Sequence, residues 1–356
     1  MKRGLVILDS DETSLEAFGS RLDAVRAKVK AASSSVALIY GDVSRSGDIN
    51  YLTNLCLYWN EAVLAVPLQG KPALITKLSK RVQPWMHKTS ILDDIRSGPR
   101  LADNVGKFLD ERFGTREGRV CVADMPWWPG GLIAQLRSAL PAGELHDLAG
   151  AVRAERLVPS VDELQLLNDA ARLLDESLAA AWKEGVDPHS RTAIAVRNIR
   201  RAGFQDASVN CGTLSDGSEY IDAIGQYRYV WVHQSQPRGG AMARSVNDSL
   251  WVAAAAIRPG MTETTLRELV SSRIGDGLKL TLSCIAHPDV ETRGLYRLSD
   301  DSRRTLHAGE VIALTLSLSG NSGVVSAAET MKVTKDGAEP LFKRAAGKQE
   351  TVDAQR

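Results

Sequence analysis

A break near the middle of the sequence constrains the fold more than any other single feature. Pro159 ends the element before it, because the residue that precedes a proline is biased away from helical geometry. Ser160 and Glu163 follow in the S-x-x-E spacing of a capping box, which marks a helix start. Apolar residues then recur at helical spacing, at Leu164, Leu167, Ala171, Leu174, Leu178 and Ala181. We therefore predict a domain boundary near residue 155 and a second domain that opens on a long amphipathic helix.

The chain before this break alternates two kinds of hydrophobic pattern. Some segments place apolar residues three or four apart, as amphipathic helices do, and others are short apolar runs typical of buried strands. A turn sequence, Gln69-Gly70-Lys71, separates two of the strand-like runs and predicts a hairpin. The helical segments are 13–31, 101–113 and 132–140, and the strand-like segments are 36–40, 62–66, 72–75 and 120–123. This alternation predicts an α/β domain over residues 1–155.

The chain after the break also mixes helices and strands. We expect further helices at 190–202, 250–257 and 262–274, the last with Thr262 as its N-cap, and strands at 219–236 and 311–333. The overall fold class is therefore α/β (α+β), with domains at residues 1–155 and 156–345 and a polar tail at 346–356.

Composition narrows the class of protein. Apolar residues make up 44% of the chain and charged residues 24%. The net charge is +1, so the chain has no strong overall positive field that would attract nucleic acid or an anionic membrane. The four cysteines are widely spaced without a CxxC pair, which is typical of reduced thiols. We find neither a signal-peptide h-region nor an apolar run of ~18 residues. We expect a soluble cytoplasmic protein with a small-molecule substrate, no nucleic-acid partner and no membrane partner.

Several segments together resemble one enzyme family, that of creatinase, prolidase and aminopeptidase P. They are NYLTNL (50–55), AVLAVPLQGKPALIT (62–76), the helix that follows Pro159, AAIRPGMTETTLREL (255–269) and LHAGEVIALTLSL (306–318), and they occur in the family's order and spacing. The resemblance implies a creatinase-type N-terminal α/β domain followed by a catalytic domain of the pita-bread fold. It also implies a homodimer, the usual assembly of this layout.

The family's metalloenzymes hold two divalent ions with two aspartates eleven residues apart, one histidine and two glutamates. The resemblance maps the first aspartate onto Asp222 and the second onto His233. It makes His287 the candidate for the histidine, and it places the glutamates at Ser317 and Ala328. Most of the metal ligands are therefore replaced in this chain.

Strand periodicity indicates where these replacements point. Ile312, Leu314, Leu316 and Leu318 alternate with Thr315, Ser317 and Ser319. Side chains two apart share one face of a strand, so we predict that Ser317 points into the site. Glu329 has the opposite parity to Ala328 and should point away from the site unless a bulge intervenes.

Two divalent ions side by side need bridging carboxylates to screen their repulsion. Because His233 and Ala328 occupy the positions of the bridging ligands, we expect no metal cofactor. The alternative is a single ion held by Asp222, His233 and His287.

Creatinase breaks a C–N bond without metal, using a histidine as acid and base. His233 is suited to this role with Asp222 as its orienting partner, because an ordinary imidazole titrates near pH ~6.5. Creatinase's own histidine corresponds to the segment VNCGTLSDGSEY (209–220), which contains none here. Its mechanism therefore does not transfer directly.

Other residues have a functional and a structural interpretation each. Tyr227 and Trp231 should share one strand face with His233, as pocket walls or as core. Cys211 is either a nucleophile with His233 as its base or an inert buried thiol. The remaining candidates are His287 as a substrate contact or a surface turn, Arg293 as a carboxylate clamp or a solvated side chain, and Trp59 as a pocket lid or a packing residue.

Two functions remain open. The first is a metal-independent, or at most mononuclear, creatinase-like enzyme that acts on a C–N bond of a small amide, guanidino or amino-acid-like substrate. Its catalytic residues would be His233, Asp222 and Ser317. The second is a catalytically dead relative that serves as a binding or scaffold protein.

Overall fold

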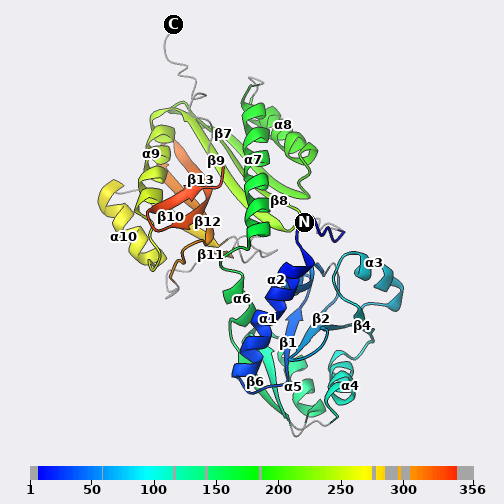
Figure 1. The fold of residues 1–356 in the computed structure, drawn as a ribbon. Helices are drawn as coiled ribbons and strands as arrows, with labels where there is room; N and C mark the ends of the chain where they lie inside the picture. The colour runs from blue at the N-terminus through cyan, green and yellow to red at the C-terminus, as the bar shows by residue number, and fades with distance from the viewer. Residues whose placement is uncertain are drawn as a thin grey trace. The chain divides into compact units, whose positions relative to one another are not determined.

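A computed structural model describes residues 7–57, 59–114, 118–140, 143–183, 187–274, 278–284, 296–297 and 305–342 (Figure 1). Contacts divide the described chain into two compact units. The first contains the residues up to Glu163, and the second contains those of 164–283 together with those from Arg297 onward. Each unit packs helices against a β-sheet, which confirms the predicted α/β class.

The first unit is built on a six-stranded sheet in the order β4-β3-β2-β1-β5-β6. Strand β2 pairs antiparallel with β1 and β3, whereas β4, β5 and β6 each run parallel to a neighbour. The predicted hairpin is present as β2–β3, and Gly70 in its turn has φ +91°, which side chains with a Cβ rarely adopt. The strands are β1 (Val36–Gly41), β2 (Ala62–Pro67), β3 (Ala73–Thr76), β4 (Asp94–Ser97), β5 (Gly118–Ala123) and β6 (Gly143–Leu148).

Helices cover both faces of this sheet, so its central strands are apolar at nearly every position. In β1, Ile39 joins a core with Val25 of α1 and Met86 of α3, whereas Leu38 joins the opposite core with Phe108 of α4. The helices over the first face are α1 (Leu15–Ala31), α2 (Gly47–Thr53), α3 (Gln83–Lys88) and α6 (Ala151–Glu155), and those over the second are α4 (Leu101–Phe113) and α5 (Gly130–Ala139). This unit has three layers, α/β/α.

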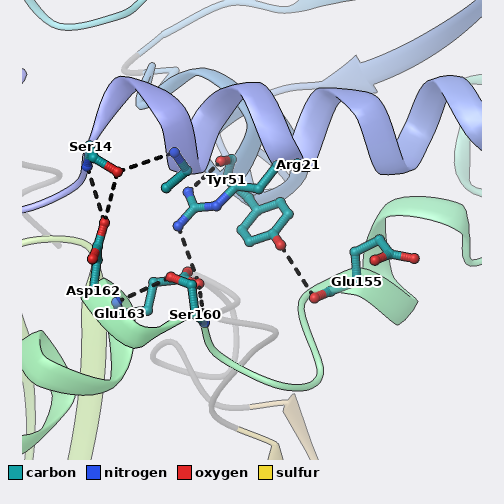
Figure 2. A network of polar contacts seen from close by, with 8 residues as sticks. Ser14, Arg21, Tyr51, Glu155, Ser160, Asp162 and Glu163 are labelled. Atoms are coloured by element: carbon teal, nitrogen blue, oxygen red, sulfur yellow. Dashed lines mark hydrogen bonds and ion pairs between the residues drawn. The ribbon is translucent and has the colours of Figure 1, made fainter.

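The predicted capping box starts helix α7 (Val161–Lys183). The backbone nitrogen of Ser160 donates to Oε2 of Glu163 at 3.0 Å, and the nitrogen of Glu163 donates to Oγ of Ser160 at 3.3 Å. Glu163 also pairs with Arg21 of α1 at 3.2 Å, in a network that Figure 2 shows. The buried Arg21 guanidinium donates to the Tyr51 carbonyl oxygen at 2.8 Å and lies 4.4 Å from the centroid of that ring. Burial, with the nearby charge of Glu163, raises the pKa of the Tyr51 phenol to about 12.

The second unit is built on an eight-stranded sheet whose main path runs β11-β10-β12-β13-β9-β8-β7, with β14 paired to β13. Each of the two long strands predicted from sequence is a hairpin. The first reverses at Arg228 and Tyr229, where Arg228 has φ +54°, and the second reverses between Gly320 and Gly323. The strands are β7 (Asp206–Thr213), β8 (Ser218–Tyr227), β9 (Val230–Gly239), β10 (Leu278–Cys284), β11 (Tyr296–Arg297), β12 (Val311–Gly320), β13 (Gly323–Thr334) and β14 (Gly337–Pro340).

Helices α7, α8 (Pro188–Arg201) and α9 (Ala241–Ala256) lie over one face of this sheet (Figure 1). Helix α10 (Glu263–Ile274) follows, and Thr262 caps it as predicted, since its Oγ1 accepts from the nitrogen of Thr265 at 3.1 Å. None of the helices in the described part of the chain is long and apolar enough to cross a membrane. The opposite face of the sheet carries the candidate site.

Candidate active site on the second sheet

An aspartate and a histidine meet on the face of the second sheet away from α7. The β8–β9 register pairs Asp222 with Ser235 and Ile224 with His233, so Asp222 and His233 project from the same face on neighbouring strands. Nε2 of His233 lies 2.9 Å from Oδ1 of Asp222. The histidine side chain is 8% exposed and the aspartate side chain 24%, so the pair is largely shielded from water. The eleven-residue offset thus brings together the two residues that the sequence singled out.

The charge state of Asp222 fixes the direction of this hydrogen bond. Burial raises the pKa of the carboxyl, whereas the positive charge of a protonated His233 and its hydrogen bond lower that pKa. The neighbouring side chains of Ser235 and Asn210 also lower that pKa, and together these effects hold the pKa of Asp222 below its usual value. An ionised carboxylate can only accept, and Nε2 of His233 therefore carries the proton.

Two threonines complete the surroundings of His233. Its backbone nitrogen donates to Oγ1 of Thr330 at 2.9 Å, and that hydroxyl donates to the His233 carbonyl oxygen at 2.9 Å, so the β9 backbone is fastened to β13 at this residue. Oγ1 of Thr315, on β12, lies 3.4 Å from Nδ1 of the ring. Sequence reasoning found neither role, because both depend on which strands pair.

Neutral side chains form the rest of the described site. Ala328 pairs with Ser235 on one side and with Thr315 on the other. Ser317 lies on the same strand face as Thr315, as predicted, but its hydroxyl is 2.7 Å from that of Ser326 and its described hydrogen bond does not reach His233. Hydroxyls and a methyl group therefore stand where the resemblance places glutamates.

Glu329 points to the helix-covered face, as its parity predicts. It pairs with Leu314 in the β12–β13 register, without a bulge, and its Oε2 accepts from Nε2 of Gln234 at 3.2 Å. Glu329 consequently cannot stand in for the glutamate that the resemblance places at Ala328.

A buried polar network, which the sequence analysis missed, occupies that helix-covered face. Oδ1 of Asp175, on α7, accepts from the side-chain amides of Gln234 at 2.9 Å and Gln236 at 3.1 Å. Nε1 of Trp182 donates to Oε1 of Gln236 at 3.0 Å. The signal was present in the sequence: two glutamines alternate with His233 and Ser235 on a strand that is otherwise buried.

The prediction that Tyr227 shares a face with His233 is wrong. The chain reverses between Tyr227 and Trp231, so their parity cannot be counted along one strand. Tyr227 lies on the helix-covered face, where its ring centroid is 5.4 Å from that of Phe204. Trp231 does lie on the site face, and it is 4% exposed.

Cys211 is also on the helix-covered face, because β7 pairs it with Ile221 rather than with Asp222. Burial raises the pKa of its thiol, although Thr192 and Arg191 partly oppose this. A protonated thiol on the far face cannot use His233 as its base, so the nucleophilic interpretation of Cys211 is wrong.

The remaining candidates are placed less fully. His287 and Arg293 lie outside the described residues. Trp59, in the first unit, stacks on Trp85 with ring centroids 6.2 Å apart, and its role as a lid stays a prediction. Within the described residues, no three His, Cys, Asp or Glu side chains gather as metal ligands would. Asp222 with His233 offers one carboxylate, which does not fit a pair of divalent ions.

Comparisons with known proteins agree with this architecture. No family model and no curated protein sequence matches the chain. Among solved structures, the prolidase from Pyrococcus horikoshii is similar at a TM-score of 0.70 and 16% identity, covering 92% of this chain and 99% of that one. The X-Pro aminopeptidase from Thermotoga maritima has a TM-score of 0.74 and 13% identity, covering 91% and 98%. Dipeptidase PepE from Mycobacterium ulcerans has a TM-score of 0.70 and 17% identity, covering 93% and 96%.

These similarities extend over nearly the whole of each chain, and they confirm the resemblance drawn from sequence at the level of the fold. The protein therefore has the two-domain fold of the prolidases, dipeptidases and X-Pro aminopeptidases, with a creatinase-type α/β domain followed by a pita-bread domain.

Proposed function

We propose that this chain hydrolyses a C–N bond of a small amide or amino-acid-like substrate, with His233 as acid–base group and Asp222 as its orienting partner, and without a dinuclear metal centre. The hydrogen bond of 2.9 Å between these two side chains carries the proposal. An imidazole whose tautomer is set by a carboxylate is a suitable proton acceptor and donor at neutral pH. Structural neighbours named for cleaving X-Pro bonds support a C–N bond as the target.

The tautomer of His233 determines which ring nitrogen can accept a proton. Asp222 keeps the proton on Nε2, so the lone pair of Nδ1 is the basic position. That nitrogen takes a proton as an oxygen nucleophile adds to the carbonyl carbon, and it returns the proton to the nitrogen that departs. The imidazolium formed between these steps is stabilised by the ionised carboxylate of Asp222.

The described charges favour a neutral substrate over a guanidino compound. A guanidinium needs a carboxylate partner, and Asp222 is already bonded to His233. The neighbouring side chains on the site face, Ser235, Ala328 and Thr315, carry no charge. We therefore place amides ahead of guanidino compounds.

The test is turnover of a panel of small N-acyl amides, X-Pro dipeptides and guanidino compounds by metal-depleted protein. We expect hydrolysis of at least one amide after chelation, and its loss in the His233→Asn variant under conditions in which that variant is folded. Turnover that appears only with two equivalents of a divalent metal would contradict the proposal. Saturable binding of a panel member without turnover would instead identify the alternative, a non-catalytic binding protein.

The proposal extends to the assembly of the protein, its location and its domain bounds. We propose a homodimer that acts in the cytoplasm, with domains at residues 1–155 and 156–345. The resemblance of the layout to family members supports the dimer, and the even charge balance of the chain supports a small-molecule partner over nucleic acid.

A further inference from the structure

We propose that Thr315 is the nucleophile of this site and forms a covalent acyl-enzyme. The inference rests on the proposed function, because it assigns the oxygen that attacks the carbonyl carbon. Thr315, His233 and Asp222 would act as nucleophile, base and orienting acid, one from each of three strands, β12, β9 and β8.

The tautomer of His233 singles out this hydroxyl. Nε2 of His233 is engaged by the Asp222 carboxyl group at 2.9 Å, so Nδ1 is the nitrogen of the neutral ring that is left to accept a proton. Oγ1 of Thr315, at 3.4 Å, is the described side-chain group at Nδ1, so its hydroxyl donates to the base that would deprotonate it. Such contacts are often long without substrate and shorten when it binds.

Burial indicates that Thr315, rather than the imidazole, meets the substrate. His233 is buried, and Thr330 holds its backbone at both the nitrogen and the carbonyl oxygen. Thr315 lies on the same face but is only half-buried. In the series of contacts from Asp222 through His233 to Thr315, the Thr315 hydroxyl is therefore more accessible than the imidazole.

The neighbouring hydroxyls are engaged elsewhere. Ser317, the catalytic candidate expected from sequence, shares a hydrogen bond of 2.7 Å with Ser326. Ser235 donates to the Ser326 carbonyl oxygen at 2.8 Å. The hydroxyl that contacts His233 therefore belongs to Thr315, two residues before Ser317, the position that the family resemblance selected.

The chemical steps balance without any further reactant than water. Oγ1 of Thr315 adds to the amide carbonyl carbon while its proton passes to Nδ1 of His233. The tetrahedral adduct collapses, the C–N bond breaks, and the proton on Nδ1 passes to the departing amine. Water, deprotonated by the same nitrogen, then attacks the threonine ester, which releases the carboxylic acid and restores the hydroxyl.

Acylation by p-nitrophenyl acetate tests the assignment without knowledge of the natural substrate. We expect a burst of p-nitrophenolate and one acetyl group on Thr315, located by fragment-ion sequencing. Fragment ions are needed because no lysine or arginine lies between Thr315 and Ser317, so trypsin leaves both in one peptide. Thr315→Val should lose the burst and the label, Thr315→Ser should keep both, and His233→Asn should slow acylation by about 10²–10⁴-fold.

Thr192→Val is the matched control, because it removes a hydroxyl that bonds the Pro188 carbonyl oxygen on α8. It should acylate as the wild type does, and melting temperatures should show that every variant is folded. An acetyl group on Ser317, or wild-type acylation in Thr315→Val, would overturn the proposal. Amide turnover that needs His233 but survives Thr315→Val would overturn it too, while leaving the proposed function intact. Acylated Thr315 with no amide turnover would count against the proposed function alone.

Discussion

Asp222 and His233 lie on opposite strands of one hairpin, two residues out of direct register, and this diagonal brings Oδ1 to 2.9 Å from Nε2. Nδ1 of the same ring faces β12, where it lies 3.4 Å from Oγ1 of Thr315. The orientation of the ring therefore depends on the charge of Asp222, and several measurements follow from that dependence.

Asp222→Asn should lower kcat/KM by about 10²–10⁴-fold, because a carboxamide can donate to Nε2 and shift the ring proton to Nδ1, where a base is needed. The variant should remain folded, since the two side chains are nearly the same size. Asp169→Asn, on the outer face of α7, is the control for loss of one negative charge. Equal kcat/KM in wild type and Asp222→Asn would remove Asp222 from the mechanism.

Stability should fall in acid through Asp222. The pKa of this carboxyl is lower in the folded protein than its unfolded value of ~3.9. A group with a depressed folded pKa contributes stability that is present above the unfolded pKa and is lost as the pH falls toward the folded pKa. The gap in melting temperature between wild type and Asp222→Asn should therefore shrink as the pH falls below ~4. A gap that widens in acid would contradict the assigned direction of the shift.

The buried network under α7 should matter for stability rather than chemistry. Asp175→Ala leaves the amides of Gln234 and Gln236 without this acceptor, at a cost of about 1–3 kcal/mol for each group left unpaired. Asp169→Ala, in an exposed ion pair with Arg172 on the same helix, should cost below about 1 kcal/mol. Urea unfolding of both variants measures the difference, and equal losses would show that the network is dispensable.

The pair of Arg21 and Glu163 should behave as one coupled unit (Figure 2). Arg21→Ala strands a carboxylate that is 13% exposed, and it should lower the free energy of unfolding by about 3–5 kcal/mol. Glu163→Gln keeps the capping-box geometry but removes the charge. The double variant should lose clearly less unfolding free energy than the sum of the losses in the two single variants. A loss equal to that sum would show that the two groups do not interact.

Assembly is tested separately by sedimentation. We expect a dimer at micromolar concentration, with a sedimentation coefficient that does not fall on dilution through that range. A monomer throughout would contradict the proposed homodimer.

Much of this fold was predictable because local patterns determine it. The hairpin turn at Gly70, the capping box at Ser160 and the parity of Glu329 each depend on a few neighbouring residues, and each is confirmed. The offset between Asp222 and His233 was likewise readable along the chain.

What the sequence did not predict depends on pairing between distant segments. The reversal at Arg228 lies in an aromatic run without glycine, proline or asparagine, so the run was interpreted as one strand and Tyr227 was assigned to the wrong face. Strand β7, at the sheet edge, was missed although Ala207, Val209 and Cys211 alternate with polar residues. The contact between Thr315 and His233 spans 82 residues and depends on the β12–β13 register, so the family resemblance selected Ser317 instead.

The two faces of strand β9 have different roles, one at the candidate site and one in the buried network under α7. His233 and Ser235 face the site, and between and beside them Gln234 and Gln236 hold Asp175 of α7. A slip of β9 by one residue would turn every side chain to the opposite face. Asp222 would then meet a carboxamide, and an imidazole would be forced beneath the helix against a buried carboxylate. The hydrogen bonds of the two glutamines thus fix the register of β9, and this register places the imidazole of His233 on the opposite face of the sheet.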